Sequence, residues 1–266
     1  MKNFNNFAKK KRLNQPLVLI TAYSYSFAKI IDSIEEIDAI LVGDSVANVE
    51  YGYETTIPVN MEQMLNHVSI VSETCKQKPV IADMPFLSYG VSTADSIKNA
   101  GRMMKEGKAN GVKIEGGKEF AELVYKMTMI GIPVMGHIGL KPQHYNVMGG
   151  YRISGKNEDQ VEELIADAVA LEQAGIFSLI LECVTEEAAK AITNAISIPT
   201  IGIGAGKYCD GQICVLNDLL GLSSYIPSFM EKYVDLFSIS KDAIEKWAKD
   251  VISGTFPKTS FHKDQQ

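Results

Sequence analysis

The chain has 266 residues, of which 46% are hydrophobic and 22% are charged, and this composition is typical of a soluble globular protein. Thirty-two acidic against 26 basic residues give a net charge of −6, which argues against a broad nucleic-acid surface. The length allows one large domain or two small ones.

Residues 1–15 are predicted to form a basic N-terminal helical segment with no assigned function. Their cluster Lys9-Lys10-Lys11-Arg12 is too short for a nucleic-acid patch and favours a solvated helix end. No apolar stretch behind it could serve as a signal peptide, and no apolar run anywhere reaches the length of a membrane span. We therefore expect neither nucleic-acid nor membrane partners.

The four cysteines include no Cys-x-x-Cys pair: they are Cys75, Cys183, Cys209 and Cys214. This spacing favours free thiols in a reducing compartment over disulfides or a zinc site. The expected location is therefore cytoplasmic.

From Pro16 onward, short apolar runs alternate with amphipathic segments. The runs predict strands at 17–21, 38–43, 79–82, 112–115, 132–136, 177–181, 198–203 and 212–216. The amphipathic segments predict helices at 24–33, 61–75, 93–106, 119–129, 158–174, 186–195 and 229–252. Nearly all-apolar strands alternating with helices indicate a parallel sheet covered by helices.

Eight such units match the size of a closed (β/α)₈ barrel, which is typically about 250 residues long. A doubly wound open sheet usually has fewer strands and a glycine fingerprint after the first one, and Thr21-Ala22-Tyr23 is not that fingerprint. We predict one α/β domain, a (β/α)₈ TIM barrel over residues 16–256, followed by a flexible tail at 257–266.

Polar residues stand at the carboxyl ends of several predicted strands, where barrel enzymes build their active sites. They are Asp44, Ser45, Asp83, Lys113, Glu115, His137 and Glu182. A single aspartate at a strand end is more often a helix cap, and an isolated Lys-x-Glu is more often a solvated surface pair. Because these seven residues come from five or six separate strands and stand at the same end of the barrel, together they predict one catalytic site.

Three of these residues, Asp44, Asp83 and Glu115, would gather three carboxylates at one barrel mouth. Like charges without a counter-ion would raise one another's pKa, so a hard cation is expected. All-oxygen ligands suit Mg²⁺, with Mn²⁺ or Co²⁺ as substitutes.

Glu182 follows Leu179-Ile180-Leu181, and this apolar setting could raise the pKa of its carboxyl toward that of a useful general base. His137 could equally be a hydrogen-bonded packing residue or a group that positions a substrate oxygen. The glycine loop 202–206 fits a phosphate site and a tight turn about equally well.

Six motifs in this order resemble the ketopantoate hydroxymethyltransferase family over about residues 7–256. They are Val42-Gly43-Asp44-Ser45, Ala82-Asp83-Met84-Pro85-Phe86, Val112-Lys113-Ile114-Glu115-Gly116-Gly117, Gly136-His137-Ile138-Gly139-Leu140, Leu181-Glu182-Cys183-Val184 and Ile201-Gly202-Ile203-Gly204-Ala205-Gly206. The resemblance implies a metal-dependent barrel that transfers the one-carbon unit of 5,10-methylenetetrahydrofolate to 3-methyl-2-oxobutanoate in pantothenate biosynthesis. It also suggests a homo-oligomer, a decamer.

Matched motif by motif, the resemblance implies that Asp44, Asp83 and Glu115 form the metal site. It also implies that Ser45 and Lys113 contact the keto acid and that Glu182 is the catalytic base. Ser24 stands where an aspartate is expected, which bears on hydrogen bonding near the first strand.

Three other functions remain open on the residues alone. The chain could be another barrel lyase or mutase that acts on a 2-oxo acid through the same metal site. Lys113 could be the nucleophile of a Schiff-base aldolase. The barrel could also bind a metabolite or a partner without catalysis.

Overall fold

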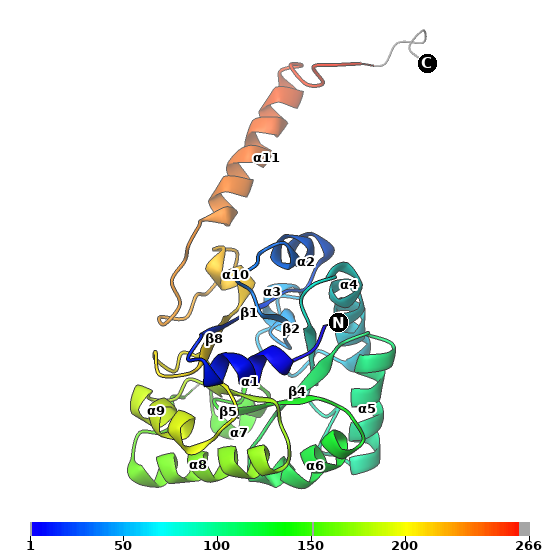
Figure 1. Ribbon diagram of the computed structural model, residues 1–266. Helices are drawn as coiled ribbons and strands as arrows, with labels where there is room; N and C mark the ends of the chain where they lie inside the picture. The colour runs from blue at the N-terminus through cyan, green and yellow to red at the C-terminus, as the bar shows by residue number, and fades with distance from the viewer. Residues whose placement is uncertain (1, 151, 261–266) are drawn as a thin grey trace. The chain divides into compact units, whose positions relative to one another are not determined.

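The computed structural model describes residues 2–150 and 152–260, and its centre is a closed parallel barrel (Figure 1). Eight strands pair in chain order, and β8 pairs with β1 to close the ring. The strands are β1(Leu17–Thr21), β2(Ala39–Val42), β3(Val80–Asp83), β4(Gly111–Glu115), β5(Val134–Gly139), β6(Ser178–Glu182), β7(Thr200–Ile203) and β8(Gly211–Cys214). The predicted (β/α)₈ fold is confirmed.

Helices connect the strands and surround the barrel (Figure 1). The α-helices are α1(Asn5–Arg12), α2(Tyr25–Asp32), α3(Val46–Val49), α4(Met61–Thr74), α5(Thr93–Lys105), α6(Ala121–Met129), α7(Tyr145–Met148), α8(Glu158–Gln173), α9(Glu186–Ala195), α10(Leu216–Leu219) and α11(Leu236–Ile252), with 3₁₀ helices η1(Lys118–Phe120) and η2(Pro142–His144). In the described part of the chain, no helix is long and apolar enough to cross a bilayer.

Most predicted boundaries lie within two residues of the observed ones, and two differences matter. The fifth strand continues three residues beyond its predicted end, so His137 lies inside β5 rather than after it. The last helix begins at Leu236, seven residues later than predicted, and residues 229–235 before it contain no helix or strand.

The chain divides into two compact units, Met1–Leu216 and Asn217–Gln266. The first contains all eight strands, and it includes the N-terminal residues that the sequence had set apart from the barrel. The second contains α11, in which no residue is buried. Residues 257–260 form no helix or strand, and the rest of the predicted tail, 261–266, lies outside the described residues.

The barrel interior is filled by aliphatic side chains from alternate strand positions. Leu17 and Leu19 of β1 point inward, whereas Val18 between them is 37% exposed, because successive side chains of a strand point to opposite faces. Their inward partners on the other strands include Leu41, Ile81, Met135, Ile180, Ile201 and Ile213. This packed core holds the strand ends in fixed positions.

The N-terminal helix α1 is part of this core through Phe7, whereas its last turn carries the basic cluster, in which Lys9 and Arg12 are exposed, as expected of a solvated helix end, and Lys10 and Lys11 are partly buried. The Phe7 ring is buried in the barrel core and lies edge-on to Phe177, just before β6. Lys10 pairs with Asp38 at 2.7 Å, and Lys11 pairs with Asp210 at 2.9 Å. Since both aspartates precede a strand, α1 closes the N-terminal end of the barrel.

We predict that Phe7→Ala destabilises the folded chain by about 3–5 kcal/mol, because the change leaves a cavity where a fully buried ring closes the core. The measurement is urea unfolding followed by circular dichroism. Lys9→Ala, at an exposed position on the same helix, is the control and should change stability by less than about 0.5 kcal/mol. Equal stability of the two variants would show that α1 is not part of the core.

Candidate active site

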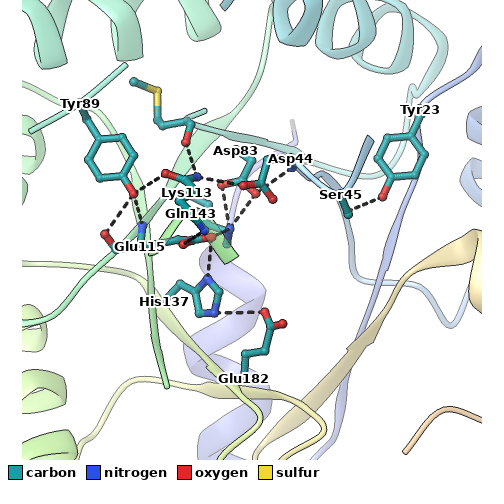
Figure 2. A network of polar contacts seen from close by, with 11 residues as sticks. Tyr23, Asp44, Ser45, Asp83, Tyr89, Lys113, Glu115, His137, Gln143 and Glu182 are labelled. Atoms are coloured by element: carbon teal, nitrogen blue, oxygen red, sulfur yellow. Dashed lines mark hydrogen bonds and ion pairs between the residues drawn. The ribbon is translucent and has the colours of Figure 1, made fainter. Parts of the chain in front are cut away.

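Six of the seven predicted site residues meet at the carboxyl ends of β2 to β6 (Figure 2). Strand register brings them together, since Asp83 is aligned with Lys113 and Glu115 with His137 across neighbouring strands. Asp44 follows β2, and its backbone N–H donates to Asp83 Oδ2 at 3.0 Å. One row of polar groups therefore crosses the mouth of the barrel.

Lys113 lies between two carboxylates. Its Nζ donates to Asp83 Oδ1 at 2.8 Å and Oδ2 at 2.7 Å, and it lies 3.5 Å from Glu115 Oε1. Burial opposes the charge of the ammonium, but the carboxylates prevail and raise the Lys113 pKa. A protonated, ion-paired amine is not a nucleophile, so this arrangement disfavours the Schiff-base alternative.

The three carboxylates are buried in different electrostatic settings. Burial and the charges of Asp83 and Glu115 raise the pKa of Asp44 well above its usual value. Burial also raises the pKa of Asp83, against the opposing effect of Lys113. For Glu115, burial is outweighed by Lys113 and His137, which lower its pKa to about 2. The negative charge at Asp44 is thus the least compensated of the three.

His137 links Glu115 to Glu182. Its Nδ1 lies 3.5 Å from Glu115 Oε1, and its Nε2 lies 3.2 Å from Glu182 Oε2, so each ring nitrogen faces a carboxylate without a well-aligned hydrogen bond. Burial and the Lys113 charge oppose an imidazolium, but the two carboxylates outweigh them and raise the pKa of His137 to about 9. A protonated His137 is an orienting group for Glu182 and not a proton acceptor.

Glu182 ends β6 with its side chain 20% exposed. The sequence suggested that this carboxylate is enclosed by apolar side chains, but in the structure it is partly open to solvent. Its backbone carbonyl accepts from Leu140 N–H at 2.8 Å, and Gly139 opposite has a φ of +96°. A Cβ at Gly139 would lie 2.3 Å from that carbonyl oxygen, so only glycine allows this approach. The base candidate stands on a fixed backbone at the barrel mouth.

Ser45 is set apart from the charged row. Its Oγ lies 2.7 Å from the Tyr23 hydroxyl and makes no hydrogen bond to the other predicted site residues among those described (Figure 2). Ser24, where the resemblance leads us to expect an aspartate, is the N-cap of α2, and its side chain makes no capping hydrogen bond. In the glycine loop, φ is +60° at Gly204 and +72° at Gly206, which is the tight-turn geometry.

Sequence reasoning missed two residues of the network, Tyr89 and Gln143. Both are buried, and the Tyr89 hydroxyl lies 3.0 Å from Gln143 Oε1. Gln143 lies in η2, inside the long loop after β5, and Tyr89 lies in the loop after β3. Neither stands next to a strand end, and a buried amide or phenol has no spacing that marks it as part of a site.

Comparison with known proteins decides the family. The family model described as ketopantoate hydroxymethyltransferase matches residues 1–259. The chain belongs to this family. The 3-methyl-2-oxobutanoate hydroxymethyltransferase of Pseudothermotoga lettingae is 48% identical over 256 residues, 96% of each chain. That of Thermotoga maritima is 50% identical over 250 residues, 94% of this chain and 92% of the relative. The chain is therefore a hydroxymethyltransferase that acts on small molecules.

Solved structures of other families share the fold. A 2,3-dimethylmalate lyase, a member of the PEP mutase/isocitrate lyase superfamily, aligns with a TM-score of 0.64 at 16% identity, covering 98% of this chain and 89% of that one. A phosphonopyruvate hydrolase in complex with oxalate and Mg²⁺ aligns with a TM-score of 0.63 at 12% identity, covering 100% and 93%. At these identities the likeness extends to the barrel alone.

Membership of this family implies a divalent cation. The negative charge of the buried carboxylates at the barrel mouth is suited to holding one. Asp44 is a buried carboxylate, and among the residues that the structure describes its Oδ2 accepts from an uncharged amide alone, that of Gln143 at 3.0 Å. Within the described residues, no three His, Cys, Asp or Glu side chains form a ready-made metal cluster. Magnesium is usually held by one or two carboxylates, with water and substrate completing its shell, so Asp44 and Asp83 are enough.

We predict that His137 titrates near pH 9 in the metal-free protein. Because this folded pKa exceeds the unfolded value of 6.5, the contribution of the imidazolium to stability should be complete below pH 6.5 and lost as the pH rises through about 9. NMR of the imidazole resonances, assigned by the signal that His137→Gln removes, measures the pKa directly. Titration below pH 6.5 would mean that burial dominates and that His137 is neutral.

Proposed function

We propose that the chain transfers a hydroxymethyl group from 5,10-methylenetetrahydrofolate to 3-methyl-2-oxobutanoate, giving 2-dehydropantoate (ketopantoate) and tetrahydrofolate, as a step toward pantothenate. The names of its close relatives supply the acceptor and the reaction type. The observation that supports the proposal for this site is the row Lys113, Glu115, His137 and Glu182, in which a buried ammonium and a partly exposed carboxylate lie at one barrel mouth.

We assign Asp44 and Asp83 as the direct ligands of Mg²⁺ or a similar divalent cation. Glu115 was also predicted as a ligand. Asp83 and Glu115 both face Lys113, but Asp83 lies next to Asp44, from whose backbone N–H it accepts at 3.0 Å, whereas Glu115 faces His137 and the backbone N–H of Gln143. We therefore place Glu115 beside the metal site, as the anchor of the two cationic side chains. A cation bound there would supply positive charge to the oxygens of the 2-oxo acid.

The other site residues bind the substrate and transfer its proton. Lys113 presents a buried, permanently charged ammonium to the substrate's anionic oxygens, and we keep Ser45 and His137 as further substrate contacts. Glu182 takes the proton from C3 of the keto acid, and the electron pair of that C–H bond forms the enolate. The enolate carbon then bonds to the methylene carbon, and both bonds from that carbon to the two folate nitrogens break. One water supplies the hydroxyl group, and the proton taken by Glu182 and the second hydrogen of that water end on the two nitrogens, which gives tetrahydrofolate.

A lyase or mutase acting on another 2-oxo acid is the closest alternative, because solved structures with those titles share the barrel. Identities of 12–16% to them, against 48–50% to the hydroxymethyltransferases, favour one-carbon transfer. Turnover of 3-methyl-2-oxobutanoate that requires methylenetetrahydrofolate separates the two functions.

We also propose a homo-oligomer, with ten copies as the expected number. Helix α11 supports it, because Phe237, Ile244, Trp247 and Val251 form an apolar stripe along one helix face, and all are exposed. The free thiols of Cys75, Cys183 and Cys209 agree with the expected cytoplasmic location, which stays a proposal.

The base assignment predicts that Glu182→Gln stops proton abstraction while the keto acid still binds. The readout is exchange of the C3 hydrogen of 3-methyl-2-oxobutanoate with deuterated water, without folate. Wild type should exchange, and a chelator should abolish exchange. The exchange rate of the variant should be lower by about a hundredfold or more.

The control for this experiment is Glu187→Gln, an exposed carboxylate of α9 five residues away, which should exchange at the wild-type rate. If Glu182→Gln also exchanges at that rate, the base is another residue. If wild type itself does not exchange, enolate chemistry is not what this site performs.

The oligomer proposal predicts that Ile244→Lys lowers the mass in solution, because a charge in an apolar contact is costly to bury. Sedimentation velocity measures the mass. Ile239→Lys is the matched control, since it changes the same residue type on another face of α11 and should leave the assembly intact. A monomeric wild type would contradict the proposal, and an unchanged mass of Ile244→Lys would remove the stripe from the interface.

A further inference from the structure

The side chain of Gln143 makes three hydrogen bonds at the barrel mouth, although it carries no charge (Figure 2). Its Nε2 donates to Asp44 Oδ2 at 3.0 Å and to the Met84 carbonyl oxygen at 2.9 Å. Its backbone N–H donates to Glu115 Oε2 at 3.2 Å. One residue of the loop after β5 thus contacts the chain just beyond β2 and β3 and the last residue of β4.

The network fixes which way the amide points. Both hydrogens of the NH₂ group meet acceptors, and Oε1 accepts from the Tyr89 hydroxyl at 3.0 Å. A flipped amide would place Oε1 against the Asp44 carboxylate and the Met84 carbonyl, where neither neighbour can donate if Asp44 is ionised. Only one orientation satisfies all three partners.

Tyr89 holds the far side of this arrangement. Its hydroxyl accepts from the backbone N–H of Glu115 at 3.1 Å, and its single hydrogen is shared between Gln143 Oε1 at 3.0 Å and the Glu115 carbonyl oxygen at 3.1 Å. Its ring packs edge-on against Phe120, with centroids 5.3 Å apart. Tyr89 and Gln143 are both buried, so no water competes for these bonds. The side chains of Asp44 and Glu115 are therefore oriented from one point.

We propose that Gln143, held by Tyr89, is a positioning residue whose side-chain amide fixes the Asp44 carboxylate for cation binding. The inference rests on the proposed metal role of Asp44. Orienting partners of ligands typically change metal affinity by about 10- to 100-fold when they are removed. Gln143 does not touch the substrate or the cation in this role. It sets the direction of the Asp44 carboxylate, which does.

The test is equilibrium binding of Mn²⁺ to the folded protein, followed by the EPR signal of the free ion and without any turnover. Gln143→Met keeps the length and the backbone N–H but removes both side-chain donors and the acceptor. It should weaken Mn²⁺ binding about 10- to 100-fold. Tyr89→Phe keeps the ring and removes the hydroxyl, so it should weaken binding in the same direction by a smaller factor.

Gln212→Met is the matched control. Its amide also donates to a backbone carbonyl, that of Gly206 at 2.9 Å, but on an exposed side chain of β8 without a bond to the carboxylates. It should bind Mn²⁺ as wild type does. Thermal unfolding of each variant separates lost affinity from lost folding, and if Gln143→Met does not fold, Tyr89→Phe decides.

Asp44→Asn distinguishes this inference from the function it rests on. If Asp44→Asn loses Mn²⁺ binding while folded Gln143→Met and Tyr89→Phe retain native affinity, the positioning role is wrong and the metal assignment stands. If Asp44→Asn binds Mn²⁺ like wild type, both are wrong. In the Asp44→Asn background, Gln143→Met should weaken Mn²⁺ binding by a much smaller factor than it does in the wild-type protein, because the two residues act through one contact.

Discussion

The site depends on one buried ammonium. Lys113 is 4% exposed and is held by Asp83 and Glu115, and it can stay charged there only because these carboxylates surround it. Removing one member of such a cluster leaves a neighbouring buried charge with fewer partners, which is costly. The same condition extends along the row, since Glu115 also faces His137 and His137 faces Glu182. The charge state of each group is thus set by its neighbours.

Counting the charges shows where a further cation belongs. Lys113 and a protonated His137 offset much of the negative charge of Asp83, Glu115 and Glu182. Asp44 remains with an uncharged amide as its side-chain partner, and its pKa is raised well above the usual value. An uncompensated buried carboxylate next to a second one is the setting in which a divalent cation stabilises the ionised form.

The two ends of the barrel do different work. The N-terminal end is closed by α1, whose Phe7 completes the apolar core and whose Lys10 and Lys11 pair with aspartates that precede strands. The carboxyl end concentrates buried charge, which on its own costs stability. The tightly packed lower part of the barrel therefore supports a polar upper part that is built for binding and proton transfer.

The strands and the charged row could be predicted from the sequence, because apolar runs mark buried parallel strands and Asp83 and Glu182 end such runs. The role of α1 could not, since Phe7 and Lys11 contact residues about 170 and 200 positions away. Gln143 was missed for a similar reason: it enters the site from a loop, where no periodicity places a side chain. The setting of Glu182 was misjudged because Leu179 and Leu181 point to the opposite face of β6, while Ile180, on the same face, lies deeper in the barrel core.

Anomalous diffraction near the manganese edge, from crystals grown with Mn²⁺ and 3-methyl-2-oxobutanoate, tests the central claim most directly. We expect one strong peak within bonding distance of carboxylate oxygens of both Asp44 and Asp83. The Lys113 ammonium should lie beside this peak and should not occupy the metal position itself. A peak bound elsewhere, or no peak at this site while the keto acid occupies the barrel mouth, would contradict it.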